Sequence, residues 1–138
     1  MGFNINSDTN FVKRKVVLVV EDDQDLREVL IERITLDGVY EVVAVENGYE
    51  AYDWLSKNAK PALVLTDFHM PCRGDILARS IDRLNIPVLM FTGNVDKAVV
   101  ALTAMNLRIP VVDKNVCFNT ILSLIDKLTA TKTKKQIA

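Results

Sequence analysis

The chain has 138 residues, of which 49% are hydrophobic and 25% are charged. These values fit one globular domain with its own core and exclude an extensively disordered chain. The formal net charge is -1, which gives no general attraction to nucleic acid or to a membrane surface. Cys72 and Cys117 match no zinc-ligand spacing, and no apolar run approaches the length of a membrane span. We therefore expect a cytoplasmic protein with reduced thiols whose function depends on a local site.

Short apolar runs rich in β-branched residues alternate with segments of helical periodicity. The runs predict five strands buried on both faces, at residues 16–20, 42–45, 63–65, 88–91 and 109–112. Five helices are predicted after them, within residues 22–36, 48–57, 75–84, 95–105 and 118–128. This alternation implies right-handed crossovers and a parallel α/β sheet covered on both sides. We expect one domain over residues 12–128, with a flexible segment at 1–11 and a flexible basic tail at 129–138.

Each predicted helix offers an apolar face to the sheet. The first helix is expected to begin at an Asp23 or Asp25 cap and to end near Gly38, which tolerates a left-handed conformation. The residues expected to be buried, in chain order, are Leu26, Val29, Leu30, Ile34, Ala51, Trp54, Leu55, Ile76, Leu77, Ile81, Leu84, Val95, Val99, Leu102, Met105, Ile121, Leu124, Ile125 and Leu128.

Polar residues gather where the predicted strands end. Ligand sites of open parallel sheets lie at the carboxyl ends of the strands, near the point where the strand order reverses. Taken singly, each polar residue has an ordinary explanation as a helix cap, a turn residue or an exposed lysine. Taken jointly, they favour a site. The residues at the ends of the first, third, fourth and fifth strands are Glu21, Asp22, Asp23, Asp67, Thr92, Asp113 and Lys114.

A strand order of 2-1-3-4-5 would place Glu21, Asp22 and Asp67 together. Three neighbouring carboxylates repel one another, and a hard divalent cation such as Mg²⁺, or Mn²⁺ in its place, relieves that repulsion. We expect Asp22 and Asp67 to bind the metal directly and Glu21 to act through water. Lys114 adds an ammonium and Thr92 a hydroxyl, which completes the groups that phosphoryl transfer to an aspartate requires.

Four stretches, "VVLVVEDDQDLR", "LVLTDFHMP", "VLMFTG" and "VVDK", resemble the signature blocks of the response-regulator receiver domain of two-component signalling. The resemblance covers roughly residues 14–128 and is strongest to single-domain, chemotaxis-regulator-like members. It implies a flavodoxin-like fold with Asp67 as the phosphoacceptor. It also implies that Glu21 and Asp22 are the metal-binding acids and that the backbone carbonyl of His69 is a further metal ligand.

The resemblance further implies that Thr92 is the switch hydroxyl and that Lys114 meets the phosphoryl group. Asp23 falls outside the matching acid pair and is expected to cap a helix. The implied partners are a sensor histidine kinase or a histidine phosphotransfer protein as phosphodonor and an unknown output protein, with no nucleic acid and no membrane. The expected role is signalling by protein contact rather than enzymatic turnover.

The sequence departs from the family pattern on the output side. Asn115 follows the lysine where the family usually has a cis proline, and a non-proline cis bond costs about 2.5–4 kcal/mol. Val111 replaces the usual Tyr or Phe, so it cannot report a change by ring rotation. Gly74 arrives one residue early, which shortens the preceding loop, and "LRIP" replaces the usual Gly-Ala before the last strand. We expect intact phosphoryl acceptance but altered transmission to the output face.

His69 leaves two interpretations open. It is either an exposed loop residue or a side chain that overhangs the phosphoryl group and controls access of hydrolytic water.

Two other functions of the chain also remain as alternatives. One is a receiver-like interaction domain that works without phosphorylation; the other is a metal-dependent phosphatase, disfavoured because His69 stands where such enzymes commonly need a second aspartate. A nucleotide-binding protein is weaker still, because no glycine-rich phosphate loop follows the first strand.

Overall fold

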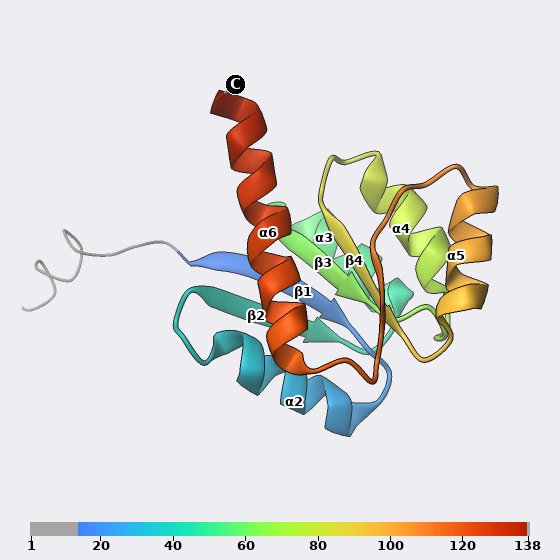
Figure 1. Ribbon diagram of the computed structural model, residues 1–138, viewed down its shortest axis with the longest axis horizontal. Coiled ribbons are helices and arrows are strands. Elements are labelled where there is room, and N and C mark those ends of the chain that lie inside the picture. The colour runs from blue at the N-terminus through green and yellow to red at the C-terminus, as the bar shows by residue number, and fades with distance from the viewer. Residues whose placement is uncertain (1–13, 138) are drawn as a thin grey trace, which may run out of the picture.

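The computed structural model of the chain describes residues 14–137, with side chains as far as residue 130 (Figure 1). The prediction for residues 1–11 lies outside the described part. Strands and helices alternate as β1 (Lys15–Val20), α2 (Gln24–Thr35), β2 (Tyr40–Val45), α3 (Gly48–Lys57), β3 (Leu63–Thr66), α4 (Gly74–Asp82), β4 (Val88–Thr92), α5 (Val95–Ala104), β5 (Val111–Asp113) and α6 (Phe118–Ile137). Within the described residues these are the five strands and five helices that the sequence predicts.

Several boundaries differ from the prediction; β2, for example, begins at Tyr40 rather than at residue 42. Two of the differences have a cause that is visible in the sequence. β5 begins at Val111 rather than at residue 109, and Pro110 before it lacks the N–H that a ladder needs. α6 continues to Ile137, beyond the expected end at residue 128. The segment after Leu128 contains neither glycine nor proline, so no residue there signals a helix end. Whether residues 129–138 are flexible stays a prediction.

All strands are parallel and lie in the order β2-β1-β3-β4-β5, as predicted for a flavodoxin-like fold. The order reverses between β1 and β3, since β1 has β2 on one side and β3 on the other. Val20 at the end of β1 is in register with Thr66 at the end of β3. The residues that follow these two strands therefore emerge next to each other.

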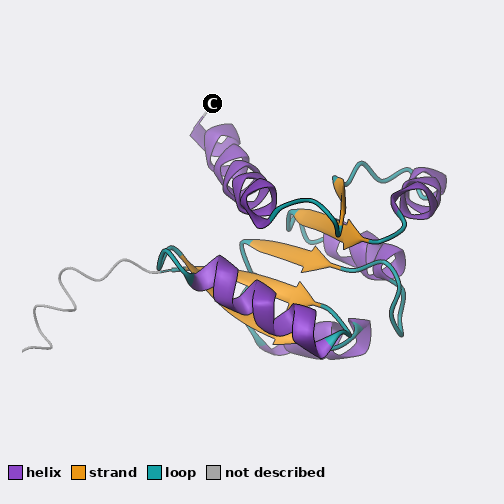
Figure 2. Cartoon of the chain, turned by 60° about the horizontal axis from the view of Figure 1, so that its bottom comes forward, coloured by secondary structure: helices purple, strands orange, loops and turns teal. Residues whose placement is uncertain are grey.

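Helices cover both sides of the sheet (Figures 1 and 2). On one side, α2 and α6 pack their buried Leu30, Ile34, Ile121 and Ile125 on alternate residues of the strands. On the other side, α3, α4 and α5 pack against the remaining strand residues, with Leu77, Ile81 and Leu102 among the buried side chains. β3, β4 and most of β1 are thus buried on both faces, as their continuous apolar runs predict. The prediction is wrong for the edge strands β2 and β5, which are mostly only partly buried because each has a neighbouring strand on one side alone.

The first helix begins as predicted. Asp23 has an extended backbone and its carboxylate accepts a hydrogen bond from the Leu26 N–H at 3.1 Å, so it is the N-cap of α2. Gly38, with φ +75°, follows the helix in the left-handed region that favours glycine. Glu21 and Asp22 lie between the end of β1 and this cap, so the cap also fixes the short loop that contains them.

The predicted buried faces were too wide in three helices. Val29 of α2, Ile76 of α4, Leu84 just after α4 and Val99 of α5 are exposed, each by 39–46%. In α5 the sequence "VDKAVVALTA" is apolar around most of its circumference, so periodicity alone does not define which side faces the sheet. The small Ala98 is fully buried there instead of Val99. No helix in the described part of the chain is both long and apolar enough to span a membrane.

Candidate functional site

Two strand ends bring the predicted phosphoacceptor beside the predicted metal-binding acids. The Asp67 N–H donates to the Val20 carbonyl at 3.1 Å, and the Glu21 N–H donates to the Val45 carbonyl at 3.1 Å. The hydrogen bonding of the sheet therefore extends one residue past β1 and β3. This extension fixes the backbone of Glu21 and Asp67 at the edge where the strand order reverses.

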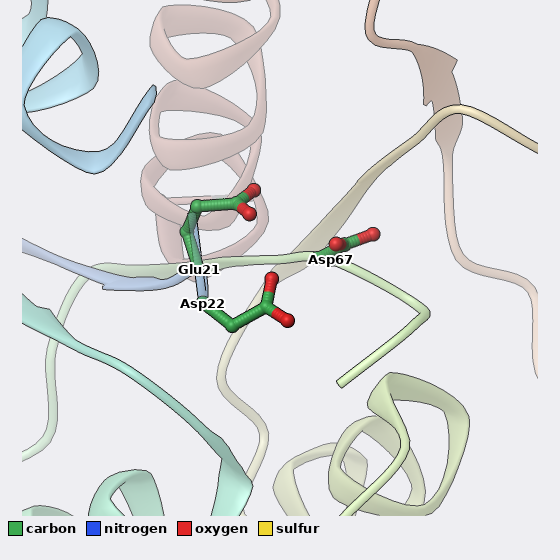
Figure 3. A group of neighbouring side chains, drawn as sticks. All are labelled: Glu21, Asp22 and Asp67. Carbon is green, nitrogen blue, oxygen red and sulfur yellow. The ribbon is translucent and has the colours of Figure 1, made fainter. Parts of the chain in front are cut away.

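The carboxylates of Glu21, Asp22 and Asp67 form a cluster, with one oxygen of each lying within 4.8 Å of the others. In Figure 3, Glu21 and Asp22 project from the end of β1 and Asp67 from the end of the neighbouring β3. Glu21 and Asp67 are buried, with exposed fractions of 1% and 5%, whereas Asp22 is exposed to solvent. The cluster is thus partly enclosed and open on the side of Asp22.

Lys114 contacts both buried acids. Its Nζ lies 3.0 Å from Asp67 Oδ2 and 3.1 Å from Glu21 Oε1. The peptide bond to Asn115 is trans, since the described residues contain no cis bond. Lys114 is held at the end of β5 by its own N–H, which donates to the Thr92 carbonyl at 2.9 Å. The lysine therefore reaches Asp67 without the usual proline after it.

The surroundings shift the pKa of both Glu21 and Lys114 upward. For Glu21 the largest influence is burial, which raises the pKa of its carboxyl, and the nearby Asp67 charge raises it further. A hydrogen bond from the Asp23 N–H and the Lys114 ammonium lower the Glu21 pKa but do not outweigh burial. Burial lowers the pKa of Lys114, but hydrogen bonds and charges from Asp67 and Glu21 outweigh it, so the net shift is upward. The ammonium form of Lys114 is thus stabilised by two neighbouring carboxylates, those of Asp67 and Glu21.

The remaining oxygen of Asp67 faces the backbone that follows. Asp67 Oδ1 accepts from the Phe68 N–H at 2.6 Å and from the His69 N–H at 3.3 Å. The His69 side chain is exposed, and its ring meets the Phe68 ring edge-on, with 4.8 Å between centroids. These contacts orient the carboxylate so that Oδ2 points to Lys114.

Thr92 is the last residue of β4, the strand next to β3, which ends just before Asp67. It is fully buried, and its hydroxyl accepts from the Asn94 N–H at 3.2 Å. Asn94 in turn caps α5 by accepting from the Lys97 N–H. Thr92 therefore connects the site to the start of α5, while its carbonyl holds Lys114 as described above. Asp113, half-buried, turns to the Asn115 N–H instead of the cluster.

Several residues around the site were missed by reasoning from the sequence. Arg27 Nη1 donates to the Glu21 carbonyl at 2.8 Å and so braces the loop that carries the acids. Gly74 lies against Asp67 so closely that a Cβ there would collide with the Asp67 carbonyl oxygen. Arg73 pairs with a fully buried Asp75 in the first turn of α4. The early glycine was a visible signal for the close approach, whereas Asp75 resembled an ordinary first-turn acid.

The donor set fits a hard divalent cation. The carboxylates of Glu21, Asp22 and Asp67 supply oxygen atoms only, and the exposed Asp22 leaves room for water and phosphate oxygens, which Mg²⁺ prefers to retain. The single ammonium of Lys114 does not neutralise three acids, so a cation would lower the remaining repulsion. The structure thus supports a site for Mg²⁺ or a similar ion at this edge of the sheet.

Sequence comparison identifies the family to which this arrangement is similar. The family model for the response regulator receiver domain matches residues 17–126. Chemotaxis protein CheY1 of Helicobacter pylori is 32% identical over 94 residues, which are 64% of this chain and 75% of the relative. Response regulator protein FleR of Pseudomonas aeruginosa is 38% identical over 91 residues, 62% of this chain but only 19% of that longer protein.

Solved structures give the same result for the fold. A response regulator receiver protein from Pseudomonas putida superposes with a TM-score of 0.72 at 26% identity and covers 84% of this chain and 98% of its own. The response regulator protein TrrA from Thermotoga maritima, solved in complex with Mg²⁺ and beryllofluoride, gives 0.70 at 29% identity, covering 83% and 98%.

Proposed function

This chain belongs to the response regulator receiver domain family, and from that premise we propose that it accepts a phosphoryl group on Asp67 from a phosphohistidine of a partner protein. It is a receiver domain of two-component signalling. The observation that carries the proposal is the contact of Lys114 Nζ with Asp67 Oδ2 at 3.0 Å. It lies within the acid cluster that Asp67 forms with Glu21 and Asp22 at the ends of β3 and β1.

Phosphoryl transfer would use the groups at this edge as follows. An oxygen of the Asp67 carboxylate attacks phosphorus, the new O–P bond forms as the N–P bond to the donor imidazole breaks, and the released imidazole nitrogen takes up a proton from solvent. The Lys114 ammonium stabilises the negative charge on the phosphoryl oxygens. Glu21 and Asp22 would hold Mg²⁺ together with Asp67 and the His69 carbonyl, and the ion would neutralise phosphoryl charge when bound.

Thr92 is the proposed link between the site and the output surface. Its buried hydroxyl accepts from the Asn94 N–H at the start of α5 and can donate its own proton to a phosphoryl oxygen, so a move of the hydroxyl toward the phosphoryl group would disturb the contact with Asn94. Such a move would shift a pre-existing equilibrium between two conformations of the α5 region. Val111 lines a shallow hollow of about 370 Å³ beside α5, where the family usually carries an aromatic ring.

His69 has a proposed modulatory role. Its exposed side chain lies two residues past Asp67, from which it can limit the access of water to an aspartyl phosphate. His69→Ala would then change the rate of dephosphorylation, measured by loss of the phosphorylated mass over time. An unchanged rate would leave His69 as an exposed loop residue.

The signalling role proposed here needs a partner on each side: a sensor histidine kinase or phosphotransfer protein as donor, and an output protein. The free thiols of Cys72 and Cys117 fit a reducing compartment, which supports the cytoplasm as the location. Turnover of substrates is not part of the proposed role.

The direct test is phosphorylation by acetyl phosphate with Mg²⁺, followed by intact-protein mass spectrometry. We expect the mass of one added phosphoryl group, which does not appear when Mg²⁺ is chelated beforehand or in Asp67→Asn. Failure of the wild-type protein to take up the group at saturating Mg²⁺ would favour a receiver-like interaction domain. Continued release of phosphate from a phosphomonoester would instead point to a phosphatase.

A further inference from the structure

Asp75 is a buried carboxylate that the proposed phosphotransfer does not use. Its side chain is fully buried at the start of α4. Arg73 donates two hydrogen bonds to it, from Nε to Oδ1 at 2.9 Å and from Nη2 to Oδ2 at 2.6 Å. The planar fork of arginine matches a carboxylate in this two-bond geometry, which lysine does not reproduce. The pair therefore defines an orientation as well as a charge balance.

The same guanidinium also covers the residue that follows the phosphoacceptor. Arg73 Cζ lies 5.6 Å from the centroid of the Phe68 ring, within the range of a cation–π contact. Phe68 is buried, its N–H donates to Asp67, and its ring touches that of His69. Arg73 thus connects the first turn of α4 to the backbone on which the site is built.

The loop between these contacts is closed at its base. The Gly74 N–H donates to the Phe68 carbonyl at 3.0 Å, and the Gly74 backbone lies directly on the Asp67 carbonyl. Because the loop is one residue shorter than the family pattern, it has little slack to absorb a shift of α4. A displacement at the start of α4 would therefore move Phe68 and His69.

Stability alone does not explain a charge in this position. Asp75 is fully buried, whereas the Arg73 side chain is 53% exposed, so solvent screens part of their attraction while the carboxylate has lost its hydration. Replacing a buried charge and its partner by neutral residues of similar size is often neutral or stabilising, because desolvation offsets the attraction. What a bidentate pair adds is a fixed geometry. The first turn of a helix also favours an acid, but an exposed acid would satisfy that preference equally well.

We propose that Arg73 and Asp75 form a positioning pair that fixes the loop after Asp67, so that the Asp67 carboxylate and the His69 carbonyl face the acid cluster. The inference deepens the proposed function and rests on it. It makes the pair an outer support of the metal site: neither residue touches the phosphoryl group.

The test compares Mg²⁺ affinity with stability in the full chain. Arg73→Gln leaves the Asp75 charge buried without its cation, whereas the double variant Arg73→Gln/Asp75→Asn makes both residues neutral. Mg²⁺ affinity is measured from amide chemical shifts, stability from urea unfolding, and loop order from hydrogen exchange of the Phe68 and His69 amides. Lys57→Gln is the control, because it breaks an ion pair with Asp53 whose side chains are both largely exposed.

We expect Arg73→Gln to lower both stability and Mg²⁺ affinity, the latter by about tenfold to a hundredfold, as for other residues that support metal ligands. In the double variant stability should recover while Mg²⁺ affinity stays low. Recovery of both together, or unchanged Mg²⁺ affinity in a folded Arg73→Gln protein, would overturn the inference.

A wild-type protein that binds no Mg²⁺ would refute the proposed function, and hydrogen exchange would then decide on the pair separately. Faster exchange of the Phe68 and His69 amides in the double variant, at recovered stability, supports positioning by Arg73 and Asp75. Unchanged exchange overturns it.

Discussion

Replacing Lys114 by methionine removes the ammonium shared by two buried carboxylates while keeping most of the side-chain volume. Loss of one partner of a buried ion pair typically costs about 3–5 kcal/mol, because the remaining charge is left uncompensated. The Lys114 side chain is 25% exposed, so solvent screens part of its charge. We therefore expect the lower end, about 3 kcal/mol of unfolding free energy, which corresponds to a fall in Tm of about 10 °C at this chain length.

The loss should depend on pH. Burial already raises the pKa of Glu21, and removing Lys114 takes away an influence that lowers it, so the Glu21 pKa rises further in the variant. A carboxyl whose pKa is raised by folding contributes stability below its unfolded pKa, and this contribution is lost as the pH rises through the folded pKa. The cost of Lys114→Met is thus greatest near neutral pH and shrinks as the pH falls toward the raised pKa.

Mg²⁺ should reverse part of the same loss. A cation bound among the three acids replaces the missing positive charge, and a ligand that binds only the folded state stabilises it. Urea unfolding near neutral pH and near pH 5, each with and without Mg²⁺, measures both effects. Lys57→Met, at an exposed ion pair, is the control and should change stability by less than about 1 kcal/mol. Equal stability of Lys114→Met and wild type near neutral pH without Mg²⁺ would show that the ammonium does not stabilise the acid cluster. A gain from Mg²⁺ in the variant no larger than the gain in wild type would show that the ion does not replace the missing charge.

Three further substitutions test other contacts. Gly74→Ala forces a Cβ against the Asp67 carbonyl and should lower the free energy of unfolding by about 3 kcal/mol and weaken Mg²⁺ binding. Gly93→Ala is its control, because a Cβ there meets open space, and it should change neither quantity in the same urea and Mg²⁺ titrations. Tyr40→Phe removes a 2.6 Å hydrogen bond to Asp126 and should cost about 2 kcal/mol. Burial raises the pKa of Tyr40, so wild-type stability should fall above about pH 10 and the phenylalanine variant should lack that part of the fall. Val111→Tyr should enlarge phosphorylation-dependent amide shifts on α5, and equal shifts in both proteins would argue against it.

The sheet was predictable from its apolar runs, and the site was predictable because its residues follow the ends of the strands. Continuous apolar runs predict strands buried on two faces, and parallel strands bring their carboxyl ends to one edge. Glu21 and Asp67 needed only the register of β1 and β3 to become neighbours. Asn115 replaces the usual proline after Lys114, and the lysine still contacts Asp67 in the structure.

Other features depend on packing that periodicity does not encode. α5 is apolar on most sides, so the prediction that Val99 is buried was wrong and Ala98 is buried in its place. The contact of Arg73 with Asp75 depends on how the short loop folds back on Phe68, and a charged residue in a first helical turn is normally exposed. Such contacts form only once the helix and loop are in place.

The proposed function requires Asp67 to be a working, Mg²⁺-dependent phosphoacceptor. A two-dimensional amide NMR spectrum recorded with Mg²⁺, before and after addition of beryllofluoride, tests it most directly, because beryllofluoride mimics a phosphoryl group on aspartate. We expect shifts around Asp67, Thr92 and Lys114 that disappear in Asp67→Asn. A wild-type spectrum that does not change at saturating Mg²⁺ and beryllofluoride would contradict it.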